Sequence, residues 1–287
     1  MSWRDRLFAW IQLPLPTLLL STAIHHLTRI RATWFKNALI RGFVRLYSID
    51  LSQAELEQAE SYEHFNHFFT RGLKPEARPL PQDSRICLSP VDGTVSQLGP
   101  ITQGRIIQAK GVDYSVVDLL GNAEAAQSFV NGQFITIYLA PYNYHRIHMP
   151  TDGALREWAY VPGRLFSVNA ATARAMPRVF ARNERLCARF QTPHGPMSMV
   201  MVGALFVGGL ETVWSGPVTP PHGQPANRYT PSGRVELGRG MEMGRFNMGS
   251  TVILLFGPNA IHWHPGLKPD LPVRMGQTLG IFGPRQA

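Results

Sequence analysis

The sequence predicts an α+β protein in which amphipathic helices at the N-terminus precede a mostly β domain. Three observations favour this class. The 287 residues are 44% hydrophobic and only 16% charged, as in a folded chain with an ample core. Gly and Pro number 26 and 23, which indicates many short elements joined by turns. Basic residues are concentrated at the start, whereas runs of β-forming residues begin only after residue 80. We therefore expect a helical region at 1–80 and a β-rich domain at 81–287.

The first 49 residues hold seven basic side chains and one acid, Asp5, although the net charge of the whole chain is only +9. Trp, Phe and Leu are interleaved with these charges, a mixture typical of a membrane interface rather than of a nucleic-acid surface. The apolar stretch at 7–24 is marginal for a membrane span, and Pro14 and Pro16 would interrupt its helix. We therefore expect association with the membrane surface and no nucleic-acid partner.

A helix at 29–47 makes the strongest case for this association. On a helical wheel its apolar residues fall within an arc of about 80°, and its arginines lie opposite. The apolar residues are Ala32, Phe35, Leu39, Phe43 and Leu46, and the arginines are Arg31, Arg41 and Arg45. An ordinary helix that faces the core would show the same arc. The absence of acids between 7 and 49 favours a helix that lies on anionic lipid.

The next segments follow from local signals. Ser52-Gln53-Ala54-Glu55 resembles a capping box and predicts a helix that continues to Phe69, followed by a proline-rich linker at 71–81. The runs 134–139, 197–210 and 251–256 predict buried strands. Pro90-Val91-Asp92-Gly93 recurs as Pro150-Thr151-Asp152-Gly153. The repeat indicates either two related β units or two hairpins, and tight Asp-Gly turns favour hairpins.

Three places carry groups suited to chemistry. The segment 144–150 holds His145 and His148 beside Tyr and Arg, a dense cluster of proton-transfer groups after a predicted strand. Asp92 lies in the first Asp-Gly turn, and Gly249-Ser250-Thr251 leads directly into the last apolar run. Taken singly, none of the three decides a function.

Together these motifs resemble the phosphatidylserine decarboxylase proenzymes of the bacterial membrane type. The resemblance extends over nearly the whole chain, and Met248 stands where Leu usually precedes the Gly-Ser-Thr, a swap of similar volume. The further matching segments are 65–69 with Arg71, 161–169, 195–197, 211–214 and 243–246.

The resemblance implies a self-cleaving enzyme that decarboxylates phosphatidylserine to phosphatidylethanolamine. The chain would be cut between Gly249 and Ser250, and Ser250 would become a covalent pyruvoyl cofactor that forms a Schiff base with the substrate amine. His148 would be the base and Asp92 the carboxylate of the self-cleavage triad. His145 is the candidate proton donor in turnover, and Ser167 could bind the head group.

The implied partners follow from the same resemblance. Residues 1–249 and 250–287 would form a heterodimer of large and small subunits, and a higher oligomer stays open. The substrate would be phosphatidylserine in an anionic membrane, with the enzyme bound peripherally on the cytoplasmic side of the cell membrane.

Two other classes compete with this interpretation. His145 and His148 with His262 and His264 could be the zinc ligands of a β-rich hydrolase, although no H-E-x-x-H motif supplies its usual base. A non-enzymatic β module with turns like those of lipoyl carriers would need a lysine at the turn tip, and neither turn has one.

Overall fold

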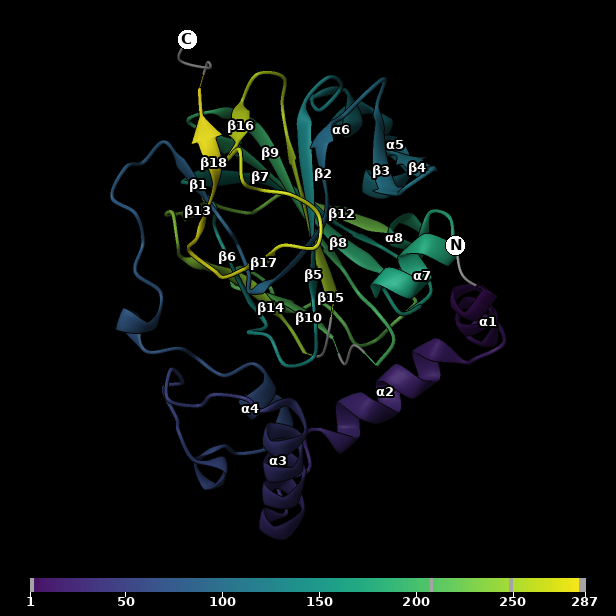
Figure 1. Ribbon diagram of the computed structural model, residues 1–287, viewed down its shortest axis with the longest axis vertical. Helices are drawn as coiled ribbons and strands as arrows, with labels where there is room; N and C mark the ends of the chain where they lie inside the picture. The colour runs from purple at the N-terminus through teal and green to yellow at the C-terminus, as the bar shows by residue number, and fades with distance from the viewer. Residues whose placement is uncertain (1–2, 207–208, 248–249, 284–287) are drawn as a thin grey trace.

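The computed structural model describes residues 3–206, 209–247 and 250–283, and it has the predicted α+β architecture. Helices α1 (Trp3–Ile11), α2 (Thr17–Leu27) and α3 (Thr33–Tyr47) form an arm that starts beside α7 at the side of the β-rich domain and runs below it, with the short α4 (Phe65–Phe69) between α3 and the sheets (Figure 1). Among the described residues, no helix combines the length and the apolar content needed to cross a bilayer.

Helix α3 divides its predicted apolar arc between two environments. Leu39 and Phe43 pack against a cluster that contains Ile40, Phe65 and Phe68, so this part of the helix faces a core. Leu46 at the end of the arc is 74% exposed. The arc is therefore only partly available to a membrane.

The predicted capping-box helix at 52–69 is wrong for most of its length. The backbone of this segment pairs with the chain ahead of it instead: Glu55 N–H donates to the Gly72 carbonyl, and Lys74 N–H donates to the Gln53 carbonyl. Ala54 and Leu73 form the resulting antiparallel bridge. Only a 3-10 turn, η1 (Ala59–Ser61), and α4 are helical there.

A large antiparallel sheet occupies the centre of the β-rich domain, and all three predicted strand runs contribute to it. Its strand order is β12-β7-β8-β9-β15-β5-β2-β17, with β13 beside β7. The bounds are β2 (Gly93–Pro100), β5 (Gln133–Leu139), β7 (Gly153–Val161), β8 (Arg185–Thr192), β9 (Gly195–Val202), β12 (Asn227–Tyr229), β13 (Glu236–Leu237), β15 (Ser250–Phe256) and β17 (Pro272–Val273). Every residue of β15 is buried, as expected for a central strand covered on both faces.

Two small sheets cover one face of the large sheet, and a hairpin with short helices covers the other. The small sheets are β1 (Ile86–Leu88)-β18 (Thr278–Phe282)-β16 (Ile261–Trp263) and β11 (Gly216–Pro217)-β10 (Leu210–Thr212)-β14 (Glu242–Phe246)-β6 (Arg146–His148). The other face carries β3 (Arg105–Ala109), β4 (Val112–Ser115), α5 (Val116–Leu120), α6 (Ala123–Gln127), α7 (Ala170–Ala175) and α8 (Val179–Arg182). Along β15, Val252 and Leu254 face the first core, whereas Ile253 and Leu255 face the second.

The hairpins predicted at the two Asp-Gly turns are absent, and the turns belong to two related β units. Each turn carries the chain from a strand of a small sheet into the large sheet, β1 to β2 and β6 to β7. Leu88 N–H donates to the Pro150 carbonyl (3.1 Å) and His148 N–H donates to the Pro90 carbonyl (2.9 Å). Residues 88 and 90 of the first unit correspond to residues 148 and 150 of the second, so exchanging the two units exchanges the two hydrogen bonds. An approximate two-fold axis therefore passes between the turns.

The two-fold relation extends to the C-terminal strands. Asp92 Oδ1 accepts a hydrogen bond from Met275 N–H, and Asp152 Oδ1 accepts one from Arg239 N–H, both at 2.7 Å. In one unit β13 pairs with β7 and β14 pairs with β6. In the other unit β17 pairs with β2 and β18 pairs with β1 in the same way. The axis therefore places Asp92, from one unit, near His148, from the other.

Candidate active site

Ser250 is the first residue of β15 and pairs with Leu139 at the end of β5. The residue is 1% exposed, and among the described residues, which exclude 248 and 249, neither its Oγ nor the Oγ1 of the neighbouring Thr251 has a hydrogen-bond partner. A buried hydroxyl without a partner costs free energy, and a catalytic role is one of the explanations for such a group in a native core. Gly249, the other half of the predicted cleavage site, lies outside the described residues.

His148 lies on β6 with both ring nitrogens engaged. Its Nδ1 is 2.8 Å from the Gly240 carbonyl, and its Nε2 is 2.9 Å from the Tyr144 hydroxyl. Because a carbonyl can only accept, Nδ1 carries the proton and Nε2 accepts from the phenol. Burial lowers the pKa of His148, and the bond to Gly240 opposes this shift in part. His148 is therefore a neutral base whose lone pair is occupied by Tyr144.

His145 has the same tautomer but a free lone pair. Its Nδ1 donates to the Asn143 carbonyl at 2.8 Å, and its ring lies against Phe69 with centroids 4.1 Å apart. Its Nε2 is buried and, like the Ser250 hydroxyl, has no partner in the part of the chain that the structure describes. Complete burial lowers the pKa of His145 to about 3, so the ring is neutral at physiological pH.

Asp92 is held by an arginine rather than by a histidine. Arg78 Nη2 lies 2.7 Å from Asp92 Oδ2, and the backbone N–H of Met275 bonds Oδ1. Both side chains are mostly buried, so this ion pair is shielded from solvent. Among the described residues, no hydrogen bond links Asp92, His148 and Ser250 into a continuous triad.

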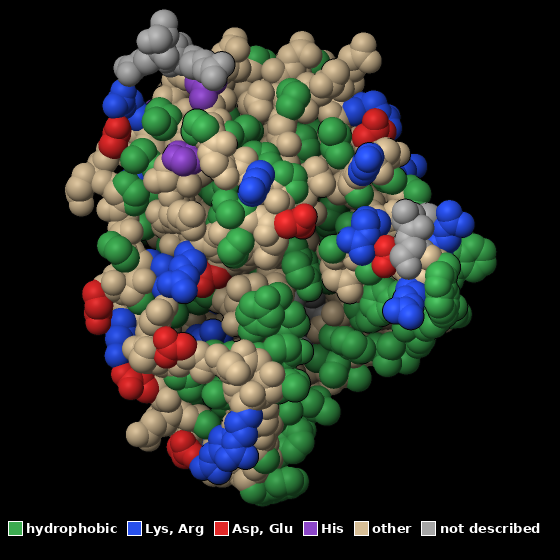
Figure 2. Space-filling model, in the orientation of Figure 1, with side chains coloured by type: hydrophobic (Ala, Val, Ile, Leu, Met, Phe, Trp, Pro, Cys, Tyr) green, Lys and Arg blue, Asp and Glu red, His purple; other side chains and the backbone are tan. Residues whose placement is uncertain are grey.

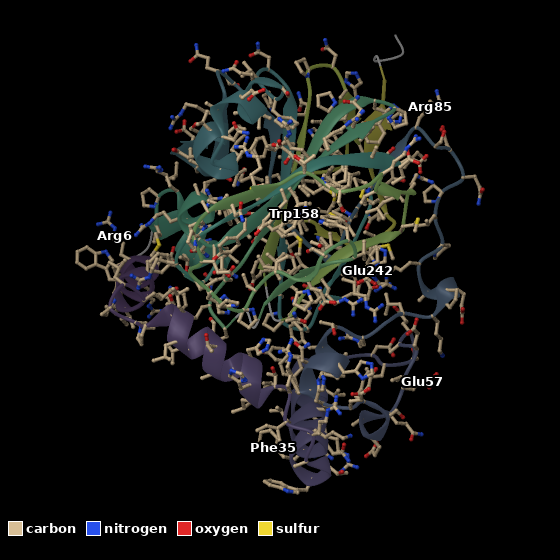
Figure 3. The ribbon with its side chains drawn as sticks, turned by 180° about the vertical axis from the view of Figure 1, so that it is seen from behind. Arg6, Phe35, Glu57, Arg85, Trp158 and Glu242 are labelled. Atoms are coloured by element: carbon tan, nitrogen blue, oxygen red, sulfur yellow. The ribbon has the colours of Figure 1, made fainter. Side chains whose placement is uncertain are left out.

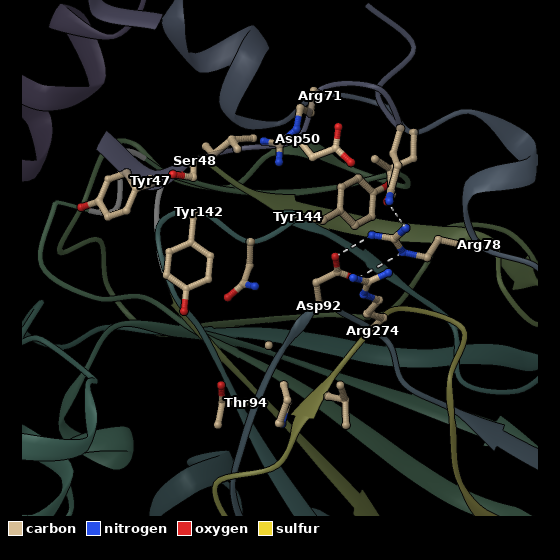
Figure 4. A pocket seen from close by; sticks show the side chains of 17 residues that line it. Tyr47, Ser48, Asp50, Arg71, Arg78, Asp92, Thr94, Tyr142, Tyr144 and Arg274 are labelled. Atoms are coloured by element: carbon tan, nitrogen blue, oxygen red, sulfur yellow. Dashed lines mark hydrogen bonds and ion pairs between the residues drawn. The ribbon is translucent and has the colours of Figure 1, made fainter. Parts of the chain in front are cut away.

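The segments that carry the three predicted residues are nevertheless neighbours in the fold. The loop 140–144 leaves the end of β5 beside Ser250 and leads directly to His145 and His148. Arg78 and Tyr144 form a wall with Asp92 in the cavity on one side and His148 in the cavity on the other. Figure 4 shows the Asp92 side, where dashed lines join Arg78 to Asp92 and the ring of Tyr144 stands next to the pair.

The chain matches known proteins over its whole length. The family model for phosphatidylserine decarboxylase matches residues 65–281, and a second model, named PSD, matches 7–48. A phosphatidylserine decarboxylase proenzyme of Pseudomonas aeruginosa is 52% identical over 291 residues, which cover all of both chains. A proenzyme of the same name from Nitrosococcus oceani is 50% identical over 280 residues, which cover 96% of this chain and 92% of its own. The chain belongs to the phosphatidylserine decarboxylase family.

Family membership makes the position of Ser167 of interest. This residue lies on the loop after β7, where its N–H donates to Gln12 Oε1 of the segment after α1 at 2.7 Å. Its Oγ accepts a long bond of 3.4 Å from Asn169 N–H. Within the described part of the chain no hydrogen bond joins Ser167 to Ser250 or to the two histidines, and its role in binding stays a prediction.

The zinc alternative is not supported by the arrangement of its four histidines. His262 and His264 line a different cavity together with Arg85. Figure 3 shows Arg85 at the end of the molecule opposite to Phe35 of α3. Among the residues that the structure describes, no group of three or more potential ligands could hold a metal ion.

Sequence reasoning missed Arg78 and Tyr144, which contact the two predicted polar groups. Arg78 lies in a segment interpreted only as a linker, because proline-rich sequence carries no signal for burial. Tyr144 lies within the histidine motif, just before β6. The motif alone does not show that its hydroxyl bonds His148. Because a buried carboxylate needs a partner, the sequence allows one to be expected for Asp92, but it does not identify which residue that partner is.

Proposed function

We propose that this chain is a self-processing decarboxylase that converts phosphatidylserine to phosphatidylethanolamine and carbon dioxide. The observation that carries the proposal is the Ser250 hydroxyl, which is buried at the start of a central strand, directly after the predicted cleavage point, and has no partner among the described residues. The relatives named phosphatidylserine decarboxylase proenzyme support the substrate.

Self-cleavage would use groups of this chain alone. Ser250 Oγ attacks the carbonyl carbon of residue 249, and a base removes the hydroxyl proton. The peptide C–N bond breaks as the acyl group moves to oxygen, and the nitrogen of residue 250 takes a proton. Loss of the Cα proton then expels residue 249 as a carboxylate and leaves dehydroalanine at 250, which water converts to a pyruvoyl group and ammonia.

The base in this proposal is His148, with Asp92 as its orienting carboxylate. Both groups are engaged elsewhere in the structure, so before the triad can form Tyr144 must release Nε2, and Nδ1–H must leave the Gly240 carbonyl for the Asp92 carboxylate that Arg78 holds. The free lone pair of His145 gives it the geometry of a competing base for the same proton. Single substitutions distinguish the two histidines.

The position of Ser250 fits a pyruvoyl group, because the residue is buried at a strand terminus and its hydroxyl is bonded to no described residue. When formed, the pyruvoyl carbonyl supplies an electron sink for the loss of carbon dioxide. In turnover the chain must also deliver a proton to the carbon that loses the carboxylate, and we assign this proton to His145. Because neutral His145 carries its proton on Nδ1, it must first take up a proton at Nε2.

Peripheral binding to the cytoplasmic side of the cell membrane would bring the site to its substrate. Large apolar side chains of α1, α2 and α3 are exposed, among them Trp3 (69%), Trp10 (70%), Leu19 (69%) and Trp34 (78%). Figure 2 shows hydrophobic side chains gathered along this arm of the molecule. Their exposure supports insertion into the lipid interface.

Electrophoresis and intact mass of purified variants test the proposal. Wild type should give fragments 1–249 and 250–287, and Ser250→Ala should remain full length and inactive. His148→Ala and Asp92→Ala should block or strongly slow cleavage, whereas His145→Ala should be cleaved yet decarboxylate about 10²–10⁴-fold more slowly.

Each outcome bears on a named role. An intact, active wild-type chain would refute self-processing. Normal cleavage of both His148→Ala and Asp92→Ala would remove them from the triad, and Asp152 of the related unit would be the next carboxylate to test. An uncleaved His145→Ala chain would make His145 the base.

A further inference from the structure

A cavity of about 310 Å³ separates the helical region from the β-rich domain. Its helical side is formed by 47–53 with Arg71 and Arg78, and its β side by 92–94, 142–144 and 272–274. Three arginines, Arg71, Arg78 and Arg274, line it together with two aspartates, Asp50 and Asp92 (Figure 4). We call it the arginine cavity.

Arg71 in this cavity is buried without a counterion. The residue is 6% exposed, its Nε has no hydrogen-bond partner among the described residues, and its guanidinium lies over the Phe68 ring at 5.4 Å. Within the described ranges it forms no ion pair: Asp92, the buried carboxylate of the cavity, is engaged by Arg78. A buried charge without a partner is costly, and burial lowers the pKa of Arg71 accordingly.

Arg185 shows how this chain treats a buried arginine that serves structure alone. It is 2% exposed, and its guanidinium donates to the carbonyls of Asp118, Leu119, Ala181 and Asn183. Every face of that guanidinium is therefore satisfied by the protein. Arg71 lacks such acceptors, so its donors are available to a ligand that enters the cavity.

The charge of the cavity favours an anion. Arg78 and Asp92 neutralise each other, so Arg71, Arg274 and Asp50 determine the remaining balance, with one positive charge in excess. Asp50 and Arg274 are both exposed and lie at the solvent side, where their charges are screened. The uncompensated charge of the buried interior is therefore that of Arg71.

The cavity also lies between the apolar arm and Ser250. Tyr47 and Tyr142 line it, both are exposed, and their rings are 5.9 Å apart. On the β side, Thr94 pairs with Tyr138, which pairs in turn with Thr251, the neighbour of Ser250. Because adjacent strands are about 4.8 Å apart, Thr94 and Thr251 are separated by about 10 Å. The cavity therefore lies within about 10 Å of the strand end that begins with Ser250.

We propose that the arginine cavity is an oxyanion-binding site in which Arg71 holds the phosphodiester of an amphiphilic ligand. This assignment rests on the proposed function for the identity of that ligand, the substrate phospholipid. The phosphodiester, rather than the carboxylate, is assigned because it joins the head group to the acyl glycerol, and the aromatic mouth of the cavity adjoins the apolar arm.

Binding and turnover test the site independently. In the Ser250→Ala chain, which stays continuous, calorimetric titration with a short-chain phosphatidylethanolamine should give a Kd that Arg71→Gln weakens about 10- to 100-fold. In the cleaved enzyme, Arg71→Lys should raise the KM for short-chain phosphatidylserine by a similar factor and change kcat less. Phosphatidylethanolamine carries no carboxylate, so weaker binding of this ligand to the Arg71→Gln chain reports on the contact between Arg71 and the phosphodiester.

Two control variants separate binding from folding. Arg185→Lys alters an equally buried arginine and should lower the urea midpoint without changing either constant. Arg234→Gln alters an arginine whose side chain is 82% exposed and should change nothing. If Arg71→Gln does not fold, Arg71→Lys in the Ser250→Ala chain carries the binding measurement.

The possible results are distinct. Unchanged Kd and KM in the Arg71 variants would overturn the site. Weakened binding of phosphatidylserine alone would assign the carboxylate to Arg71 and overturn the phosphodiester, and equally tight binding of inorganic phosphate would identify a site for a free anion. A wild-type chain that binds the phospholipid through Arg71 but releases no carbon dioxide would refute the proposed function and leave the site intact.

Discussion

At the scale of single residues, the buried histidine His145 makes stability depend on pH. Its pKa is about 3 in the folded chain because burial disfavours the charged ring, against an ordinary value of 6.5. Between these values the unfolded chain binds one more proton, so the free energy of unfolding falls as the pH falls. In the Ser250→Ala chain, this residue alone should lower it by about 2 kcal/mol between pH 7 and pH 5.

Urea denaturation at the two pH values measures this contribution. His145→Gln cannot titrate, so its loss of stability on acidification should be smaller by about the same 2 kcal/mol. The other histidines whose pKa is lowered by burial, His64, His148 and His194, remain in both chains and cancel in the comparison. Equal acid sensitivity of the two chains would contradict the assignment of a neutral, buried His145.

The same residues show what could be predicted from sequence at this scale. Residue types marked Asp92, His148 and Ser250 only as places suited to chemistry, and the resemblance to a family supplied their roles as carboxylate, base and nucleophile. The bonds that hold them were not predictable: Arg78 comes from a proline-rich segment, and Gly240 lies 92 positions from His148. Such contacts depend on the two-fold packing of the units, which weak repetition in the sequence does not reveal.

At the scale of elements, strand β15 should hold the small subunit in place after cleavage. It lies between β5 and β9 with all seven residues buried, and the same fragment supplies β16, β17 and β18 to both the large sheet and a small sheet. Fragments 1–249 and 250–287 should therefore elute together in gel filtration under native conditions and separate only in denaturant. Separation without denaturant would show that the hydrogen bonds and apolar burial of β15 do not survive cleavage.

Strands and helices differ in how well local patterns predicted them. The apolar runs that became β5, β9 and β15 were recognised because burial on both faces requires continuous hydrophobic residues. The capping-box signal at 52–55 failed because the Gly72 carbonyl accepts from Glu55 N–H and Lys74 N–H donates to the Gln53 carbonyl in an antiparallel bridge. A short helix has little intrinsic stability in water, so tertiary pairing decides such segments.

At the scale of the whole molecule, the helical arm and the β-rich domain are joined by specific contacts. Ala9 of α1 is buried, Gln12 bonds Thr172 and the loop at Ser167, and Arg164 donates to the carbonyls of Leu13 and Leu15. Deletion of residues 1–49 would therefore remove packing as well as membrane affinity. Substitution of exposed side chains is the cleaner test of membrane binding.

The triple variant Trp3→Gln, Trp10→Gln, Trp34→Gln should lose affinity for vesicles that contain phosphatidylserine by at least about 100-fold, since each buried indole contributes about 1.5–3 kcal/mol. Sedimentation with the vesicles measures the loss. A matched triple, Ile107→Gln, Val117→Gln, Ile281→Gln, replaces exposed apolar residues of β3, α5 and β18 and should bind normally. For the wild type, about 0.5 M salt should release only part of the protein, because screening weakens the attraction of basic residues to lipid but leaves apolar burial intact. Complete release by salt, or equal loss in both triples, would contradict insertion of the arm and leave charge as the sole attraction.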